Sequence, residues 1–168
     1  KEALEFVTNT VKTGGVVLFV GTKNQAQPII QKYAEACGMP YVTIRWLGGT
    51  FTNFRTIQRT IKKLETLNKL RLAEDFEMKY TKKERLLIER EIAKLENLFS
   101  GIKSMKKIPE AVFIIDVNHD KNAVKEAKIA RVKVIGIADT NVDPEQIDQL
   151  IPANDDAIKS IALITNLV

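Results

Sequence analysis

Cysteine and histidine each occur only once in the 168 residues of the chain, and their scarcity limits its chemistry. The single Cys37 excludes an internal disulfide and a metal site built from several thiolates, and it fits a reducing compartment. We expect Cys37 to be a small core residue. Nothing in the sequence places a serine or cysteine beside His119 as an activated nucleophile, so we expect this histidine in a turn and no catalytic site.

The sequence also lacks long apolar runs and the glycine motifs of nucleotide-binding proteins. No run approaches the roughly 18 apolar residues that span a membrane, and no signal-peptide pattern follows Lys1. We therefore expect a soluble, cytoplasmic protein without a membrane partner, whose natural N-terminus is missing because the chain lacks an initiator methionine. The GxxxxGKS/T and GxGxxG patterns are absent, so the Gly21-Thr22-Lys23 turn does not predict a phosphate loop and we expect no cofactor.

Strand and helix patterns alternate in the first 53 residues and again from residue 108 onwards. Short apolar runs predict strands at residues 16–20, 41–45, 111–117, 132–138 and 147–151, and amphipathic stretches predict helices at 2–12, up to Cys37, at 121–130 and at 155–163. Such alternation requires right-handed crossovers and a parallel sheet covered on both faces. We therefore expect an α/β fold, a doubly wound parallel sheet of about five strands, formed by residues 1–53 and 108–168.

Residues 54–107 follow a different pattern, with two apolar seams at helical spacing. The first seam consists of Phe54, Ile57, Ile61 and Leu64, and the second of Ile88, Ile92, Leu95, Phe99 and Ile102. Between them, Thr81 and Glu84 form a capping-box pattern that predicts the start of the second helix. The segment is therefore predicted to be an inserted antiparallel helical hairpin, a coiled coil, that projects about 30 Å from the body.

The positive charge of the chain is concentrated in this hairpin. Residues 55–107 hold 15 Lys and Arg against 8 Asp and Glu, a net of +7, whereas the rest holds 11 against 13, a net of −2; together they give +5. A basic segment on a near-neutral body is typical of an element that binds phosphate groups. The alternative is a solvated, lysine-rich helical face without a ligand.

Nine residues are the candidates for contact with RNA: Arg45, Trp46, Arg55, Arg59, Lys62, Lys63, Lys103, Lys106 and Lys107. Those on the first arm share a helical face, and the last three return near the same root. Charges so placed can follow a phosphate backbone, while Arg45 and Trp46 are suited to stack on an exposed base or sugar. In the alternative interpretation Trp46 packs under the hairpin, because it lies in the joint RWLGGTFTNF (residues 45–54) between strand and hairpin.

Five carboxylates form a second grouping, near the predicted carboxyl ends of strands and the start of the last helix: Asp116, Asp139, Asp143, Asp155 and Asp156. Their oxygens, if they converge, could hold Mg²⁺ or another divalent ion. The sequences at 139–141 and 154–156 are also ordinary turn and cap sequences. We favour the capping interpretation and predict no metal site.

Four separated motifs resemble the bacterial form of the ribosomal protein S2 family. They are RWLGGTFTNF followed by the basic helix, KKIPEAVFIIDVNHDKNAVKEA, ADTNVDPEQID and LIPANDDAIKSI, and the resemblance covers nearly all of the chain. Where the family commonly has LGGMLTN this sequence has LGGTFTN, a change at Thr50 and Phe51 that keeps the polar hinge and the apolar packing. The Gly-x-His-Phe-Gly-His pattern of the family's N-terminal segment is not in this sequence, and we make no prediction for a site that needs those histidines.

The resemblance implies a flavodoxin-like sheet with a protruding helical hairpin, acting as a structural component of the small ribosomal subunit and not as an enzyme. The implied partners are small-subunit ribosomal RNA, neighbouring small-subunit proteins and ribosomal protein S1, for which the bacterial family is a docking platform. The implied location is the ribosome, in the cytoplasm or an organelle. Two other functions stay open from the residues alone: a flavodoxin-like enzyme or small-ligand binder that uses the Gly21 turn with Asp139 and Asp156, and a coiled-coil adaptor.

Overall fold

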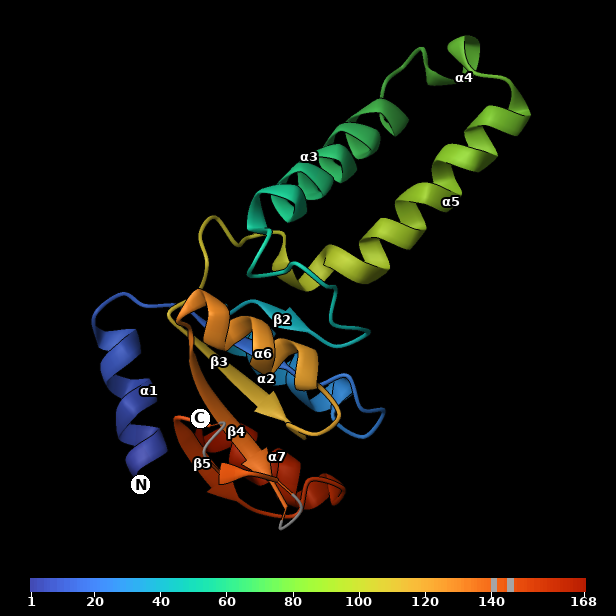
Figure 1. Ribbon diagram of the computed structural model, residues 1–168. Helices are drawn as coiled ribbons and strands as arrows, with labels where there is room; N and C mark the ends of the chain where they lie inside the picture. The colour runs from blue at the N-terminus through green and yellow to red at the C-terminus, as the bar shows by residue number, and fades with distance from the viewer. Residues whose placement is uncertain (140–141, 145–146) are drawn as a thin grey trace.

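A five-stranded parallel sheet forms the centre of the computed structural model, which describes residues 1–139, 142–144 and 147–168 (Figure 1). The strands are β1 (Val17–Val20), β2 (Tyr41–Val42), β3 (Ala111–Ile115), β4 (Lys133–Ala138) and β5 (Gln149–Pro152). Their order is β2-β1-β3-β4-β5, and every neighbouring pair is parallel. This is the flavodoxin-like order, which confirms the predicted doubly wound α/β fold and places the carboxyl ends of the strands at one edge.

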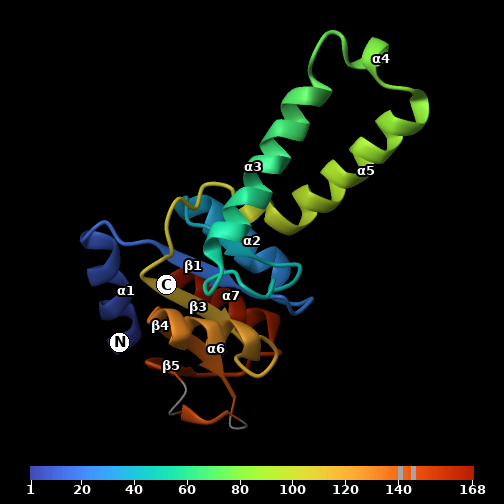
Figure 2. The ribbon, with the colours of Figure 1, turned by 45° about the horizontal axis from the view of Figure 1, so that its top comes forward.

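Helices cover both faces of the sheet, because successive strand residues point to opposite faces. Val17 and Phe19 point to the face that is covered by α1 (Glu2–Lys12), α2 (Gln27–Cys37) and α7 (Ile158–Leu167). Leu18 and Val20 point to the other face, which carries α6 (Lys121–Ala130); Figure 2 shows α6 on the near side of the sheet. All residues of β1 and β3 are buried, which explains their unbroken apolar sequences.

Two long helices leave the body and run side by side in opposite directions, as the hairpin pattern predicts (Figure 1). They are α3 (Phe54–Arg71) and α5 (Lys82–Phe99), joined by the short α4 (Phe76–Lys79); α5 is followed by a 3-10 turn, η1 (Ser100–Ile102). Each long helix has 18 residues and is therefore about 27 Å long. The predicted capping box starts α5, because Thr81 accepts the N–H of Glu84 while Glu84 accepts the N–H of Thr81. That the pair supercoils as a coiled coil stays a prediction.

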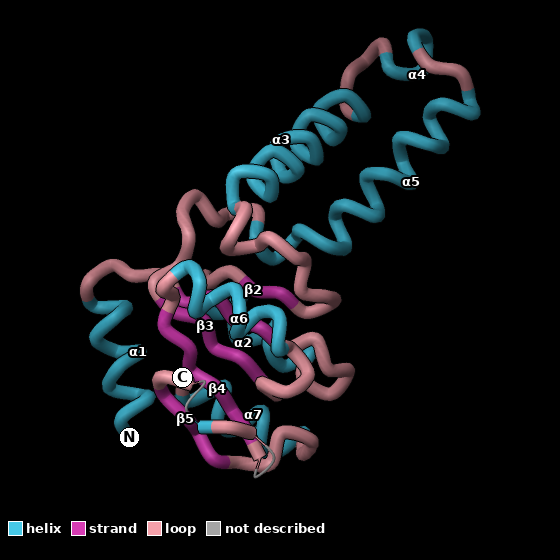
Figure 3. Tube along the Cα trace, viewed as in Figure 1, coloured by secondary structure: helices cyan, strands magenta, loops and turns pink. Residues whose placement is uncertain are grey.

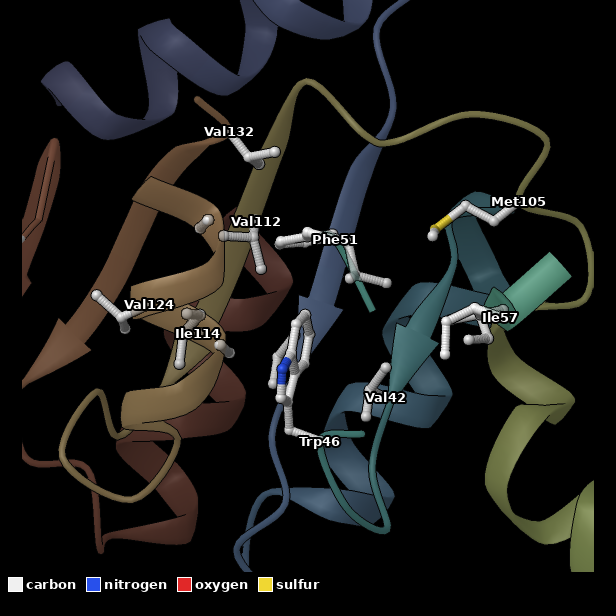
Figure 4. Packing of buried hydrophobic residues seen from close by; sticks show 14 of the residues in the cluster. Val42, Trp46, Phe51, Ile57, Met105, Val112, Ile114, Val124 and Val132 are labelled. Atoms are coloured by element: carbon white, nitrogen blue, oxygen red, sulfur yellow. The ribbon is translucent and has the colours of Figure 1, made fainter. Parts of the chain in front are cut away.

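The root of the hairpin belongs to the core of the body. Ile57 of α3 lies in the same buried cluster as Val112 of β3, Val124 of α6 and Trp46 (Figure 4). Ile102, after α5, belongs to this cluster as well. The hairpin therefore leaves the body from a packed base, which holds its direction relative to the sheet.

The predicted strand at residues 41–45 is wrong in length, since β2 ends at Val42. As an edge strand it pairs only with β1, and this pairing ends where β1 turns away at Gly21. Arg45 and Trp46 consequently lie in the loop that follows the strand, drawn in pink between β2 and α3 in Figure 3.

Other boundaries also differ from the predictions: β1 and β4 each begin one residue later than predicted, and β5 spans 149–152 in place of 147–151. Two further differences have a local cause. The strand β3 ends at Ile115 and not at residue 117, because Asp116 has a φ of 62°, in the left-handed region, and starts a turn. Helix α7 begins at Ile158 and not at residue 155, because the side chain of Asn154 accepts the N–H groups of Asp156 and Ala157 and holds them in a turn. Within the described ranges, no helix has both the length and the apolar character that a membrane span requires.

Candidate nucleic-acid interface

The basic residues of α3 lie outside the apolar seam of the hairpin. Ile57, Ile61 and Leu64 are buried between α3 and the rest of the structure, and this leaves the charged positions in solvent. Arg55, Arg59, Lys62 and Lys63 are all exposed. Lys63 forms an ion pair with Glu91 of α5 at 2.5 Å. The other three form no ion pair within the part of the chain that the structure describes, so their charges are available to a ligand.

The segment that returns from α5 brings further lysines to the root of α3. The side chain of Gln58 donates a hydrogen bond to the backbone carbonyl of Lys106 at 2.9 Å, which places Lys106 beside the first turns of α3. Lys106 is exposed, whereas Lys103 lies 3.8 Å from Glu96 and Lys107 lies 2.5 Å from Glu110. The structure therefore joins Lys106 to the cations of α3 in one surface, while acidic neighbours partly balance the other two lysines.

Trp46 packs in the core at the joint. Its side chain is 7% exposed, and its ring meets that of Phe51 edge to face, with the centroids 4.9 Å apart (Figure 4). The indole Nε1 donates a hydrogen bond to Glu126 at 3.2 Å. Of the two roles left open by the sequence, the structure supports the packing role for Trp46, while its neighbour Arg45 is exposed.

A single carboxylate of α6 holds the joint loop in place. Glu126 accepts the backbone N–H groups of Gly49 at 2.7 Å, Phe51 at 3.0 Å and Thr52 at 3.3 Å, in addition to the indole of Trp46. Burial acts to raise the pKa of Glu126, but these hydrogen bonds outweigh it and lower the pKa below its ordinary value.

Gly49, with a φ of 90°, adopts a left-handed conformation that suits glycine, in a loop whose N–H groups at Gly49, Phe51 and Thr52 point toward this carboxylate. The role of Glu126 was not predicted from the sequence. The available signal was that it is the one acidic residue in α6 and that the joint contains several N–H groups in need of an acceptor.

Three of the five carboxylates grouped in the sequence analysis surround a lysine in the structure. The Nζ atom of Lys23, in the turn after β1, lies 2.9 Å from Asp116 and 3.5 Å from Asp155, and it also pairs with Asp156. Burial acts to lower the pKa of Lys23, but the carboxylates of Asp156 and Asp116 raise it well above its ordinary value. The ammonium group therefore takes the position that a divalent ion would need, and no group of metal ligands is found among the described residues.

Asp139 and Asp143 are exposed and do not join the ion pairs of Lys23. Thr140 and Asn141, part of one predicted turn sequence, lie outside the described residues. The role of Lys23 was missed, because the sequence suggested a comparison with phosphate loops and gave no sign of three carboxylates arriving from β3 and the start of α7.

The two rare residues behave differently from each other. His119 lies in the turn after β3, as predicted, where its backbone N–H donates to the Asp116 carboxylate at 2.9 Å. The prediction that Cys37 is a core residue is wrong, because the residue is exposed. Cys37 is the last residue of α2 and lies on its outer side, where Gly38 ends the helix in a left-handed conformation.

The structure defines an α/β protein with a parallel sheet and a projecting helical hairpin, whose root carries exposed cations. The model of the family described as ribosomal protein S2 matches residues 1–168. The chain belongs to the ribosomal protein S2 family.

The relatives agree with this assignment. The chain is 50% identical over 162 residues to the small ribosomal subunit protein uS2 of Francisella philomiragia, a match that covers 96% of this chain and 67% of that protein. It is 47% identical over 167 residues to the uS2 proteins of Corynebacterium urealyticum and Corynebacterium efficiens, which covers 99% of this chain and 62% and 60% of theirs. The chain thus spans about three fifths to two thirds of the length of these curated relatives. Their names are those of ribosomal proteins, which confirms that the family is not one of enzymes.

Proposed function

We propose that this chain is a structural component of the small ribosomal subunit and that it binds ribosomal RNA through the root of its hairpin. The observation that carries the proposal is the set of exposed cations at this root, namely Arg55, Arg59 and Lys62 of α3 with Lys106 beside them. Their side chains form no ion pair in the described structure and are held over a rigid base. The relatives' names, which place those proteins in the small subunit, support the same function.

The spacing of these cations suits a phosphate backbone. Arg55 and Lys62 are seven residues apart on one helix, about 10 Å along its axis, so together with Arg59 between them they can contact more than one phosphate of a strand. Arg45, exposed at the joint, extends the same surface toward the body. Lys63, Lys103 and Lys107 lie at its margin, where their acidic partners reduce the net charge, and Trp46 contributes by supporting the joint.

The organisation of the chain gives each part a role in this function. Residues 54–107 are proposed to be the RNA-binding insertion, and residues 1–53 and 108–168 the domain that carries it. Because Ile57 and Ile102 pack into the core of that domain, the insertion presents its charges in a fixed direction. From the resemblance to the bacterial family we further propose contacts with neighbouring small-subunit proteins and a docking platform for ribosomal protein S1, in the cytoplasmic or organellar ribosome.

Charge reversal in the full chain tests the RNA-binding role. Arg59→Glu should lower the fraction of protein that sediments with small subunits in a sucrose gradient, and it should reduce the salt dependence of binding to small-subunit ribosomal RNA by about one phosphate contact. The matched control is Lys159→Glu, which makes the same change of charge at an exposed position of α7. Equal sedimentation of Arg59→Glu and the wild type would contradict the role of the hairpin.

A further inference from the structure

A cleft of about 490 Å³ opens beside the joint, at the carboxyl edge of the sheet. One wall is formed by Arg45, Trp46 and Gly48 of the loop that leads to α3, and the other by His119 and Asn122 after β3. The cleft lies next to the ends of β1 and β3, where the strand order changes direction. Doubly wound proteins bind their ligands at this kind of position, because the loops on either side diverge there.

The groups at the floor of the cleft are already engaged. Asp120 is 5% exposed, and its carboxylate accepts hydrogen bonds from the backbone N–H of Thr22 at 3.3 Å and the hydroxyl of Thr22 at 2.9 Å. The indole N–H of Trp46 is used by Glu126. The buried Asp120 carboxylate is therefore directed at Thr22, and the groups left to contact a ligand are those at the mouth of the cleft.

Three exposed side chains stand at the mouth: the Arg45 guanidinium, the His119 imidazole and the Asn122 amide. Arg45 supplies a permanent positive charge and a flat surface, His119 a second flat surface, and Asn122 both a donor and an acceptor. These groups match the parts of one nucleotide: a phosphate for the positive charge, a flat base for the flat surfaces, and a base edge or ribose for the donor and acceptor. The volume also suits a single small ligand, since such sites usually measure about 300 to 1,000 Å³.

We propose that this cleft receives one unpaired nucleotide of the bound RNA, with its phosphate at Arg45 and its base or ribose against His119 and Asn122. The proposal rests on the proposed RNA-binding function, to which it adds a second kind of contact. The cations of α3 contact phosphates without regard to sequence, whereas a nucleotide in the cleft must be unstacked and single-stranded. The joint loop connects the two surfaces directly, because the chain runs from Arg45 into α3 within ten residues.

The test uses the full chain and a transcript of small-subunit ribosomal RNA, with chemical acylation of the ribose to report on each unpaired nucleotide. In the wild-type complex we expect protection of an unpaired nucleotide that Asn122→Ala and His119→Ala both make reactive again. Each variant should also weaken binding about fivefold, as expected for one lost contact. Both residues are exposed, so the variants should melt at the wild-type temperature. Lys125→Ala, an exposed change on α6 at a residue that does not line the cleft, is the control.

The outcomes separate the cleft from the hairpin. If Arg59→Glu weakens RNA binding while the cleft variants leave both affinity and protection unchanged, the cleft proposal is overturned and the proposed function stands. If neither Arg59→Glu nor the cleft variants weaken binding, both proposals fail. Binding of a free nucleoside monophosphate in the cleft, with no change of RNA protection in the variants, would identify a small-molecule site and would also overturn the proposal.

Discussion

The carboxylate of Glu126 accepts the indole N–H of Trp46 at 3.2 Å, although the two residues are 80 positions apart in the sequence. The contact links α6, on the body, to the loop from which the hairpin starts. The same carboxylate holds the N–H groups of Gly49 and Phe51 in this loop. The direction of the proposed RNA-binding surface therefore depends on a residue that lies outside that surface.

The first prediction concerns the stability that Glu126 contributes. Glu126→Ala leaves several half-buried N–H groups without an acceptor, and we expect a loss of about 2–3 kcal/mol in the free energy of unfolding, measured with urea. Lys125→Ala, at the exposed neighbouring position of α6, should change it by less than about 0.5 kcal/mol. Similar values for the two variants would show that the carboxylate does not hold the joint.

The pH dependence of the same residue has a defined sign. The pKa of Glu126 is lowered in the folded protein from its ordinary value of 4.5, so the folded state favours the ionised form. Its contribution is therefore complete above about pH 4.5 and is lost as the pH falls through the lowered pKa. The difference in unfolding free energy between the wild type and Glu126→Gln should be constant near neutral pH and shrink below this value. A difference that grows on acidification would contradict the assignment.

The third prediction tests the lysine that lies among three carboxylates. Lys23→Met leaves Asp116 and Asp155, both largely buried, without a positive partner, and we expect a loss of about 2–3 kcal/mol at neutral pH. The loss should decrease on acidification, because burial and the charge of Asp116 raise the pKa of Asp155, and its protonation removes the repulsion between the two side chains.

Lys133→Met serves as the control for Lys23→Met. It breaks an ion pair with Asp148 in which the lysine side chain is 57% exposed, and it should cost less than about 1 kcal/mol. The effect of Mg²⁺ on stability tests whether the ammonium takes the place of a metal ion. Millimolar Mg²⁺ should stabilise Lys23→Met more than the wild type, because the carboxylates of the variant lack their own cation. If Mg²⁺ stabilises Lys23→Met and the wild type equally, the Lys23 ammonium does not occupy a position that a divalent ion can take.

Features that depend on local pattern were predictable, and those that depend on distant contacts were not. The bounds of α1 and α6 agree with the prediction, and the capping box at Thr81 starts α5, because periodicity and caps act within a few residues. The extent of β2 depends on where its neighbour β1 turns away, which its own sequence does not show.

The supporting contacts of the site were missed for the same reason. Glu126 and Lys23 each bind groups that lie more than 70 residues away along the chain, and no spacing in the sequence relates these partners. The charges of α3 were predictable as a helical face, but the ion pair of Lys63 with Glu91 of α5 was not, because it depends on how the two helices pack.

A fourth prediction uses the cap of the second hairpin helix. Thr81→Ala removes the hydroxyl that accepts the N–H of Glu84, and we expect a loss of about 1 kcal/mol and faster hydrogen exchange at Glu84. Thr66→Ala is the control, because Thr66 is an exposed interior residue of α3 and alanine is at least as favourable there. Unchanged exchange at Glu84 in Thr81→Ala would show that the capping box does not define the start of α5.

The last prediction concerns the close approach between the return of the hairpin and the edge of the sheet. A Cβ atom added to Gly101 would lie 2.2 Å from the carbonyl oxygen of Tyr41 in β2, so even alanine cannot be accommodated without a shift of backbone. We expect Gly101→Ala to lower the free energy of unfolding by about 1–3 kcal/mol, as overpacked sites do, and to weaken RNA binding by displacing the root of the hairpin.

Gly48→Ala is the matched control for this substitution. A Cβ atom at Gly48 would meet no atom within 4 Å, and its φ lies outside the left-handed region, so the change should leave the unfolding free energy within about 0.5 kcal/mol. Urea unfolding of both variants provides the measurement, and the RNA titration of Gly101→Ala is compared with that of the wild type. If Gly101→Ala is as stable as Gly48→Ala, the hairpin is not held against β2 at this point, and the fixed direction of its charges must depend on Glu126 and the buried seam alone.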